Sequence, residues 1–433
     1  MKIDPNIVRK FRQAAPTYAT YPAADRFVEA FDAPTLANWI TAGNAFGMRD
    51  GVTLKIRFPM TSQPAFITKR DDSGGNLDWY PHHLEHEARI VSRLVSHDAV
   101  IDSMHWSGCT GTLPPARQAQ LLEVLRENFP FAAIGAFSAD VNPALSLPSS
   151  LAALRQAGVT RVEIGTPNLA LLPADRTRSL ERQTLTTTLV TAARQEGMTS
   201  IGADLIYGSP GQTLPAFEHS LEALQASEPD RITLRSCAPT SKTKSSQLAM
   251  LLLGADALQT AGYRCIGIDQ FARPGDQLAI AHRQGRLTRL PYGYAPRPSS
   301  TVLALGPGAI GIAGPTYYQN QRNADDYCGA LERGELPVMR GLQLSSDDMI
   351  RRAIIHSLMS NLFVDIEVIA GTHQVDFNAH FAAELQELAT FEAAGLLHIG
   401  EGMITVEPAG YLMLGAICRV FDRYGDHFKQ RGF

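Results

Sequence analysis

Six short β-rich runs alternate with amphipathic stretches, and this alternation limits the fold more than any other feature of the chain. The runs are VTLKIRF (52–58), DSMHWSG (102–108), IGAFSADV (134–141), TRVEIG (160–165), TSIGADLIYG (199–208) and RITLRSC (231–237). Amphipathic stretches such as RQAQLLEVLREN (117–128) and LTTTLVTAARQEG (185–197) lie between them. Strands that alternate with helices form a parallel sheet covered by those helices. Six units are too few for a closed eight-fold barrel, so the pattern predicts an open or partial (β/α)6 barrel.

Small and polar residues gather where these runs end. Pro59 follows the first run, the segment 107–112 closes the second, and Asp140 lies at the end of the third. The segments 166–168 and 204–212 follow the fourth and fifth. Parallel α/β sheets place their ligand chemistry at the carboxyl ends of the strands. We therefore expect the functional site to draw on these positions.

From about residue 342 the pattern changes to helices followed by a hairpin. An N-cap signal at Ser345 to Asp348 precedes MIRRAIIHSLMSNL, and a second helix, FAAELQELATFEAAG, ends at Gly395. LLHIGEGMITV is typical of a hairpin around 400–402, and a last helix includes YLMLGAICRVFDRY. These elements predict a helical, winged-helix-like domain. We divide the chain into an N-terminal segment packed over the barrel, the barrel with its extension, and this C-terminal domain, at 1–50, 51–340 and 341–433.

Composition excludes several classes of protein. A formal net charge of −4 gives no general attraction to nucleic acid or to an anionic membrane, and no helix is rich in Arg and Lys. No stretch reaches the roughly eighteen apolar residues of a membrane helix, and the first residues lack the apolar run of a signal peptide. The five cysteines are scattered singly, as reduced cytosolic thiols are. We expect a cytoplasmic protein that neither binds nucleic acid nor inserts into a membrane.

Seven blocks share one resemblance. They are PTYATYP (16–22), LKIRFPM (54–60), MHWSGCTGT (104–112), ADLIYGSPGQT (203–213), IDQFARPGDQLAIAHRQG (268–285), YYQNQ (317–321) and AICRVFDRY (416–424). In this order and spacing they resemble the oxygen-independent coproporphyrinogen III oxidases, which are radical S-adenosylmethionine enzymes. The resemblance implies a radical-SAM-type partial barrel and a tetrapyrrole substrate. It also implies a 4Fe–4S cluster held by CxxxCxxC and a deoxyadenosyl radical that starts the decarboxylation of two propionates.

The cluster loop departs from the family. With Pro59 in register, the three cysteine positions are Thr61, Ala65 and Thr68. Hydroxyl and methyl groups do not replace thiolates as cluster ligands. No two cysteines of the chain lie within twenty residues of each other, and Cys109 in the next loop supplies one thiolate only. We therefore expect no 4Fe–4S cluster and no radical chemistry.

The positions that bind S-adenosylmethionine in the family have changed as well. The usual aromatic residue of the first strand is Lys55, and the glutamine after the fourth strand is Pro167. In the glycine-rich loop Thr110 matches the family, the strand-end glutamate is shortened to Asp140, and Asp204 matches the acidic residue before LIYG. Thr110, Asp140 and Asp204 are the candidate cofactor-binding residues that remain. The other changes argue against S-adenosylmethionine binding, which stays open at this point.

Aromatic and basic residues are the candidates for contact with a tetrapyrrole. The resemblance places Tyr18 and Tyr21 over the substrate, and Tyr21 is our candidate there. Arg273 in FARP, with Arg283 and Arg286 beyond it, suits the bidentate recognition of propionate carboxylates. Exposed arginines are common, so their alternative role is ordinary surface charge.

Two histidine patterns and one glycine-rich run have alternative interpretations. His82 and His86 are four residues apart on a helix expected after Pro81, which is a metal-ligand spacing, but a solvated helix start explains them as well. His105 follows an apolar strand residue, and we interpret it as a structural histidine. GPGAIGIAG (306–314) does not fit a dinucleotide motif, and we expect it to form a tightly packed helix or turn.

Three functions follow from a family framework without cluster cysteines. In the first, the chain binds haem or a porphyrin(ogen) in haem metabolism or utilisation. In the second, it is an active coproporphyrinogen dehydrogenase by an unrecognised route. In the third, it is a non-catalytic partner of an active paralogue. The sequence does not separate the first from the third.

Overall fold

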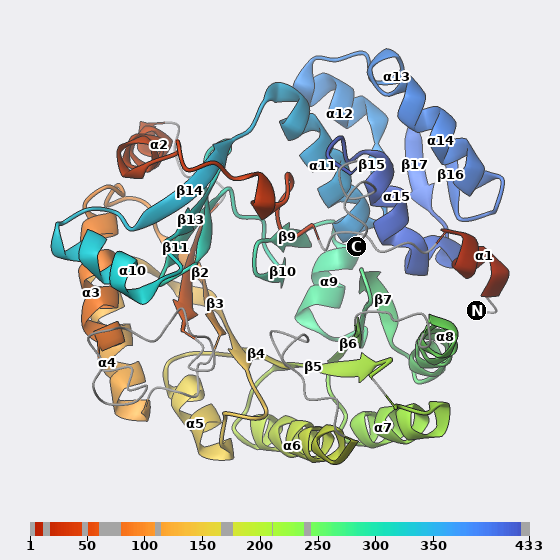
Figure 1. Ribbon diagram of the computed structural model, residues 1–433, viewed down its shortest axis with the longest axis horizontal. Helices are drawn as coiled ribbons and strands as arrows, with labels where there is room; N and C mark the ends of the chain where they lie inside the picture. Colours follow the sequence, from red (N-terminus) through yellow and green to blue (C-terminus); the bar gives the residue numbers. More distant parts are fainter. Residues whose placement is uncertain are drawn as a thin grey trace.

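The computed structural model describes residues 5–11, 18–45, 51–59, 79–108, 114–165, 176–209, 211–237 and 244–425. Within them, one large curved sheet has the strand order β14-β13-β12-β11-β1-β2-β3-β4-β5-β6-β8-β7 (Figure 1). Its centre is parallel and follows chain order from β1 to β6. These strands are β1 Val52–Phe58, β2 Ile101–Gly108, β3 Phe131–Val141, β4 Arg161–Ile164, β5 Ser200–Tyr207 and β6 Arg231–Ser236. They coincide with the six predicted runs, which confirms the partial (β/α)6 barrel.

Helices cover the outer, convex face of the curved sheet (Figure 1). They are α3 Trp79–Ser92, α4 Pro115–Asn128, α5 Pro148–Gln156, α6 Arg176–Gln195, α7 Leu214–Ala226 and α8 Lys244–Thr260. Successive strand residues point to opposite faces, so one set of each strand packs under these helices and the other set lines the barrel interior. Helix α3 begins two residues before the predicted start at Pro81, because proline is tolerated in a first turn, where its missing N–H has no partner to lose.

Short strands beyond residue 260 extend the sheet at both ends, and the sequence did not predict them. β7 Arg264–Gly267 and β8 Gln270–Ala272 pair antiparallel beside β6, whereas β11 Thr301–Leu305 pairs parallel with β1. The sheet then continues antiparallel through β12 Ile310–Ala313, β13 Thr316–Asn320 and β14 Val338–Gln343. α9 Gln277–Arg283 and α10 Ala324–Glu332 join these strands. Strands of three to six residues carry too little alternation to be recognised by pattern.

The glycine-rich run at 306–314 forms a turn and a strand, as its interpretation as a tight turn requires. Gly306 and Gly308 both have positive φ between β11 and β12. A Cβ atom at Gly306 would collide with the carbonyl oxygen of Arg57. Glycine is therefore needed here for a close approach of two backbones.

A hairpin lies on the concave side of the sheet. It consists of β9 Thr288–Leu290 and β10 Gly293–Ala295, which pair antiparallel, with Pro291 and Tyr292 at the tip. Figure 1 shows it inside the arc formed by the barrel strands. This hairpin brings Tyr292 to the barrel interior.

The C-terminal part has the predicted winged-helix-like architecture. Its elements are α11 Ser346–Asn361, β15 Phe363–Asp365, α12 Ile366–His373, α13 Phe377–His380, α14 Ala382–Glu392, β16 Leu397–Gly400, β17 Met403–Val406, η5 Pro408–Met413 and α15 Leu414–Val420. The strands form a small sheet of order β15-β17-β16. Ser345 and Asp348 form a reciprocal capping box at the start of α11, as the N-cap signal indicates.

The predicted last helix is wrong in its extent. A 3-10 helix, η5, occupies its first part, and α15 ends at Val420. The chain then turns because Oδ1 of Asp422 accepts a hydrogen bond from the backbone N–H of Tyr424, 2.9 Å away. Phe421 to Tyr424 consequently leave the helix.

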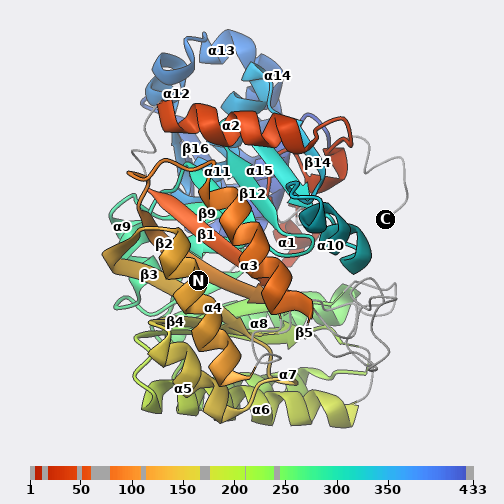
Figure 2. The same ribbon diagram turned by 90° about the vertical axis from the view of Figure 1, so that its left-hand side faces the viewer.

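The N-terminal segment contacts both larger parts. α1 Pro5–Phe11 packs against the C-terminal domain, with the Phe11 and Phe391 rings 4.8 Å apart. α2 Ala33–Ala45 lies beside the β12–β14 end of the sheet (Figure 2), preceded by η1 Ala24–Arg26. One continuous hydrophobic core joins the barrel to the C-terminal domain. Among the described residues, no helix combines the length and apolar character of a membrane span.

Candidate functional site

A layer of polar side chains lines the barrel interior. Parallel pairing aligns Lys55 with His105, His105 with Ser138, and Ser138 with Arg161, across β1 to β4. Each is less than one-tenth exposed. Neighbouring strands lie about 4.8 Å apart, so these inward-facing side chains adjoin one another.

Tyr292 covers this layer from the tip of the β9–β10 hairpin. Its ring stacks on the His105 ring, with 4.3 Å between centroids and 13° between planes. Nζ of Lys55 lies 5.9 Å from the centre of the same ring. Burial raises the pKa of Tyr292 to about 12, although nearby Arg161 opposes the shift. The phenol therefore stays neutral beside three basic side chains.

One nitrogen of His105 is hydrogen-bonded within the layer, and the other is not. Its Nδ1 lies 2.9 Å from Oγ of Ser138, which also accepts a hydrogen bond from Nη2 of Arg161 at 3.1 Å. Its Nε2 lies 3.6 Å from Oδ1 of Asp140 and has no hydrogen-bond partner among the described residues. Ser138 thus links the imidazole of His105 to the guanidinium of Arg161 through hydrogen bonds to both.

Asp140 and Asp204, two of the three candidate cofactor residues, face the same interior and interact electrostatically. The carboxylate of Asp204 already forms an ion pair with Nε of Arg235, at 2.7 Å. Burial raises the pKa of Asp204 to about 6, and the Arg235 guanidinium only partly offsets this. The structure brings the two carboxylates together, but it also gives one of them an internal partner.

Arg231 forms ion pairs with two further carboxylates, those of Glu163 and Asp276. It is fully buried and lies 2.7 Å from Glu163 and 2.7 Å from Asp276. Ser200 shares this network through hydrogen bonds to both Arg231 and Asp276. Glu163, Asp276 and Asp204 thus form their ion pairs with Arg231 and Arg235, and not with Lys55 or Arg161.

Lys55 and Arg161 are buried cations without a carboxylate partner in the described part of the chain. No ion pair joins either side chain to an acid there, and Nη1 of Arg161 has no hydrogen-bond partner. Burial, reinforced by Arg57, lowers the pKa of Lys55 to about 7, although Asp140 opposes the shift. Burial also lowers the pKa of Arg161. An arrangement of this kind can receive an anion.

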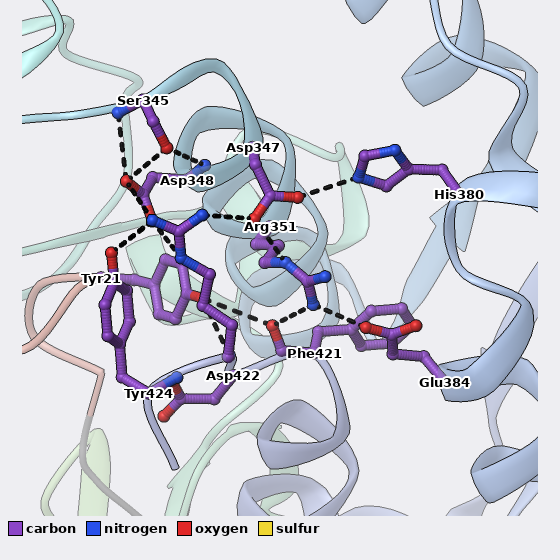
Figure 3. Close-up of polar contacts among 11 residues, drawn as sticks. Tyr21, Ser345, Asp347, Asp348, Arg351, His380, Glu384, Phe421, Asp422 and Tyr424 are labelled. Carbon is purple, nitrogen blue, oxygen red and sulfur yellow. Dashed lines mark hydrogen bonds and ion pairs between the residues drawn. The ribbon is translucent and has the colours of Figure 1, made fainter. Parts of the chain in front are cut away.

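Tyr21 lies at the junction with the C-terminal domain (Figure 3). It is buried, its hydroxyl donates to the carbonyl oxygen of Phe421 at 3.4 Å, and it accepts from the backbone N–H of Arg423 at 3.3 Å. Tyr18 similarly donates to Asp422, at 3.3 Å. Substrate contact by Tyr21 stays a prediction, since these hydrogen bonds tie the N-terminal segment to the C-terminal tail.

The same junction contains a dense ionic network around Asp347. Its carboxylate lies 2.9 Å from Nε of Arg351, 2.8 Å from Nη1 of Arg423 and 2.8 Å from Nε2 of His380 (Figure 3). Arg351 also binds Glu384, 2.7 Å away. Burial alone would raise the pKa of Asp347, but hydrogen bonds from these three groups hold it below its usual value. The network fastens α11 to α13, α14 and the C-terminal tail.

Arg273 lies away from Asp204, at the opposite edge of the sheet. Its backbone N–H donates to the carbonyl of Asp230, just before β6 begins, so it stands at the amino-terminal edge. Its guanidinium donates to the hydroxyl of Tyr263 at 3.3 Å and to Glu228 at 3.5 Å. The structure therefore does not bring Arg273 to the carboxyl ends of the strands. Arg283 and Arg286 donate to the carbonyls of Pro274 and Pro296.

The other sequence candidates are either unassembled or outside the described residues. No group of three or more His, Cys, Asp or Glu residues is placed to hold a metal ion within the described ranges, which include His82 and His86. Thr61, Ala65, Thr68, Cys109, Thr110 and Pro167 lie outside those ranges. Their identities still define the donor set of the cluster loop, and the sequence of 59–78 contains no cysteine. This set does not fit an iron–sulfur cluster.

Sequence reasoning missed several residues of the interior. Glu163, Arg161, Arg231 and Arg235 alternate with buried apolar residues in RVEI and RITLRS. Charged residues at every second position of a strand buried on both sides are a usable signal, because they face a polar interior. Tyr292 had no such signal, since only the placement of its hairpin brings it to His105.

The fold and this interior define the class: a radical-SAM-type partial barrel with a C-terminal winged-helix-like domain. The HemN C-terminal domain family matches residues 344–413. A solved structure, the coproporphyrinogen III oxidase HemN from Escherichia coli, described as a radical SAM enzyme, superposes with a TM-score of 0.85 at 28% identity. The alignment covers 98% of this chain and 99% of that one.

Curated relatives extend the same similarity along the whole chain. The oxygen-independent coproporphyrinogen III oxidase of Pseudomonas aeruginosa is 30% identical over 454 aligned positions, covering 99% of this chain and 98% of the relative. That of Salmonella typhimurium is 31% identical over 440 positions, covering 96% and 94%. The chain belongs to the oxygen-independent coproporphyrinogen III oxidase family.

Proposed function

We propose that this chain is a cluster-less member of its family that binds haem or a porphyrin(ogen) without radical chemistry. The observation that carries the proposal is a whole-length family framework, at TM-score 0.85, combined with a cluster loop that has no thiolate. The framework encloses a polar interior, and a protein of this family without its radical machinery retains the scaffold for a tetrapyrrole. The five dispersed cysteines favour a cytoplasmic location.

The side chains around the former cofactor positions support the loss of S-adenosylmethionine binding. That cofactor carries a positive sulfonium, and Lys55, with Arg57 nearby, adds positive charge at the position where the family has an aromatic ring. Asp204 is neutralised by Arg235 at 2.7 Å. Like charges in a buried site repel strongly, so the cationic cofactor is disfavoured.

The test is an equilibrium titration of the purified protein with haemin, coproporphyrin III and coproporphyrinogen III under anaerobic conditions. We expect at least one of them to bind at micromolar concentration, with a shifted Soret band or quenched fluorescence. S-adenosylmethionine, titrated in parallel, should give no binding heat. Failure of all three tetrapyrroles to bind would refute the proposal.

A second candidate is a partner protein without a ligand, and the internal ion pairs favour it. Arg235 on Asp204, Arg231 on Glu163 and Tyr292 on His105 show interior groups satisfying one another. This candidate predicts a stable complex with a cysteine-bearing member of the family in size-exclusion chromatography, and no tetrapyrrole binding. Conversion of coproporphyrinogen III to a vinyl product by the purified chain would instead identify an enzyme.

A further inference from the structure

Two buried basic side chains of the barrel interior, Lys55 and Arg161, feel nearby carboxylates but form no direct ion pair with them among the described residues. Burying an ion is costly unless it is paired or hydrogen-bonded. Lys55 and Arg161 are 7% and 6% exposed, and neither forms an ion pair in the described part of the chain. Asp204, Glu163 and Asp276 are held by Arg235 and Arg231, so they are not available to them.

Three basic side chains converge on one aromatic ring. Nζ of Lys55 lies 5.9 Å from the Tyr292 centroid, the His105 ring stacks on Tyr292, and Arg161 interacts electrostatically with its phenol. Ser138 joins the other two, because its Oγ is bonded to both His105 and Arg161. The three groups therefore adjoin a common point, although they come from three different strands.

Two of these groups have donors that are not used. Nη1 of Arg161 and Nε2 of His105 are buried atoms without a hydrogen-bond partner among the described residues. Buried polar atoms in folded proteins nearly always have a partner, so each unpaired one calls for water, an ion or a ligand atom. A carboxylate has two oxygens that together accept about four hydrogen bonds, which matches one guanidinium, one imidazole and one ammonium donor.

We infer that Lys55, His105 and Arg161, covered by Tyr292, form a carboxylate-binding site for a propionate side chain of the tetrapyrrole. The inference rests on the proposed function and adds the group that is recognised. It means that Lys55, at the position where the family has an aromatic residue, binds an anion. Oδ1 of Asp140 lies 3.6 Å from Nε2 of His105, too far for a hydrogen bond, so this nitrogen still has a hydrogen bond to give.

The first experiment compares haemin with haemin dimethyl ester, which has the same macrocycle without free carboxylates. We expect the ester to bind the wild-type protein at least about tenfold more weakly, as the loss of one charge-assisted hydrogen bond predicts. Lys55→Met and Arg161→Met should each weaken haemin binding by a similar factor and leave ester binding unchanged. Equal affinities for haemin and ester would overturn the inference and leave the proposed function intact.

A matched control removes a positive charge elsewhere. Arg117 lies exposed on α4, where its guanidinium binds Gln120, so Arg117→Met changes the net charge equally. It should leave haemin affinity unchanged, and a loss equal to that of Lys55→Met would reduce the effect to net charge and refute a specific site. Circular dichroism and thermal melting establish that each variant is folded, and Arg161→Lys replaces Arg161→Met if the latter unfolds.

A small carboxylate tests the site if no tetrapyrrole binds. Free propionate at millimolar concentration should raise the melting temperature of the wild type more than that of Lys55→Met or Arg161→Met, with sodium chloride at equal ionic strength as reference. A positive result with propionate alone identifies a small-carboxylate site while the proposed function fails. Equal shifts in all proteins would refute the carboxylate site itself.

Discussion

At the scale of single residues, Lys55 shows how strongly burial changes the acidity of a side chain in the barrel interior. Burial and Arg57 favour the neutral amine, Asp140 favours the ammonium, and the balance lowers its pKa to about 7. His105 and Tyr292 complete its surroundings without adding a fixed negative charge. A lysine in such a position changes its charge near neutral pH, which ordinary lysines do not.

Lys55 should make the stability of the protein increase with pH above neutrality. Between about pH 7 and pH 10 the unfolded chain holds a proton on Lys55 that the folded protein has lost, so the free energy of unfolding rises with pH. Lys55→Met removes this contribution. We expect the variant to be more stable than wild type by about 2–4 kcal/mol at pH 6, and the difference to shrink toward pH 10. Urea unfolding at four pH values measures it, and a constant difference would show that Lys55 titrates normally.

Glu87 illustrates how one buried carboxylate fixes the glycine turn beside β1. It is 1% exposed and accepts hydrogen bonds from the hydroxyl of Tyr327 at 2.6 Å, the N–H of Gly306 at 2.7 Å and Nδ2 of Asn320 at 2.6 Å. Glu87→Ala removes the acceptor of three buried donors, of which Nδ2 of Asn320 keeps other acceptors, so it should lower the free energy of unfolding by about 3–5 kcal/mol. Denaturant titration measures this loss.

The neighbouring Glu85 provides the control for this substitution. It lies on the same helix, and its contact is an i,i+4 ion pair with Arg89 at 3.8 Å. Glu85→Ala should cost less than about 0.5 kcal/mol. Similar losses for the two variants would contradict the role assigned to burial.

At the scale of elements, sequence patterns predicted those strands and helix ends that depend on a few adjacent residues. The strands β1 to β6 and the capping box of α11 were predicted, because apolar runs and an N-cap are read from a few adjacent residues. Strand direction is not local. Arg273 comes directly after β8, which runs antiparallel to β6, so Arg273 reaches the amino-terminal edge of the sheet instead of the ligand edge.

Asp347 connects α11 to α13 and to the C-terminal tail, and it should contribute stability only while it is ionised. Hydrogen bonds from His380, Arg351 and Arg423 overcome burial and hold its pKa below the usual 3.8. A lowered folded pKa gives stability that is present above the unfolded pKa and lost as pH falls through the folded one. Asp347→Asn should therefore cost about 1–2 kcal/mol at pH 7, and less as the pH approaches 3. Unfolding monitored at pH 7 and pH 3 tests this.

The exposed Glu196 is the control for Asp347, since it lies on the surface just after α6. Glu196→Gln should change stability by less than about 0.5 kcal/mol at both pH values. If Asp347→Asn has the same small effect, the ionic network of Figure 3 is a set of weak surface contacts.

At the scale of the whole molecule, the proposed function separates the fold of the family from its radical chemistry. A continuous core and a TM-score of 0.85 preserve the family architecture, whereas Thr61, Ala65 and Thr68 supply no thiolate. The resemblance of sequence blocks named Asp140 and Asp204 as cofactor-binding candidates; the structure places both in one interior, and their cofactor role stays a prediction. It did not predict the ion pair between Arg235 and Asp204, because an ion pair between neighbouring strands depends on register as well as on residue type.

This separation leads to a prediction about the iron–sulfur cluster. After anaerobic incubation with iron and sulfide, the wild-type chain should show neither the broad charge-transfer absorption of a cluster nor stoichiometric iron, because positions 61, 65 and 68 are Thr, Ala and Thr. If thiolates are what the loop lacks, the triple variant Thr61→Cys, Ala65→Cys, Thr68→Cys should acquire both signals. A double variant without Thr68→Cys serves as control and should bind iron only weakly, since a 4Fe–4S cluster in this family needs all three cysteines.

A cluster in the wild-type chain would mean that ligands from elsewhere hold the iron and would restore radical chemistry as the leading function. A triple variant that stays colourless would mean that the loop has lost its shape along with its ligands, and that the framework has been remodelled around another role.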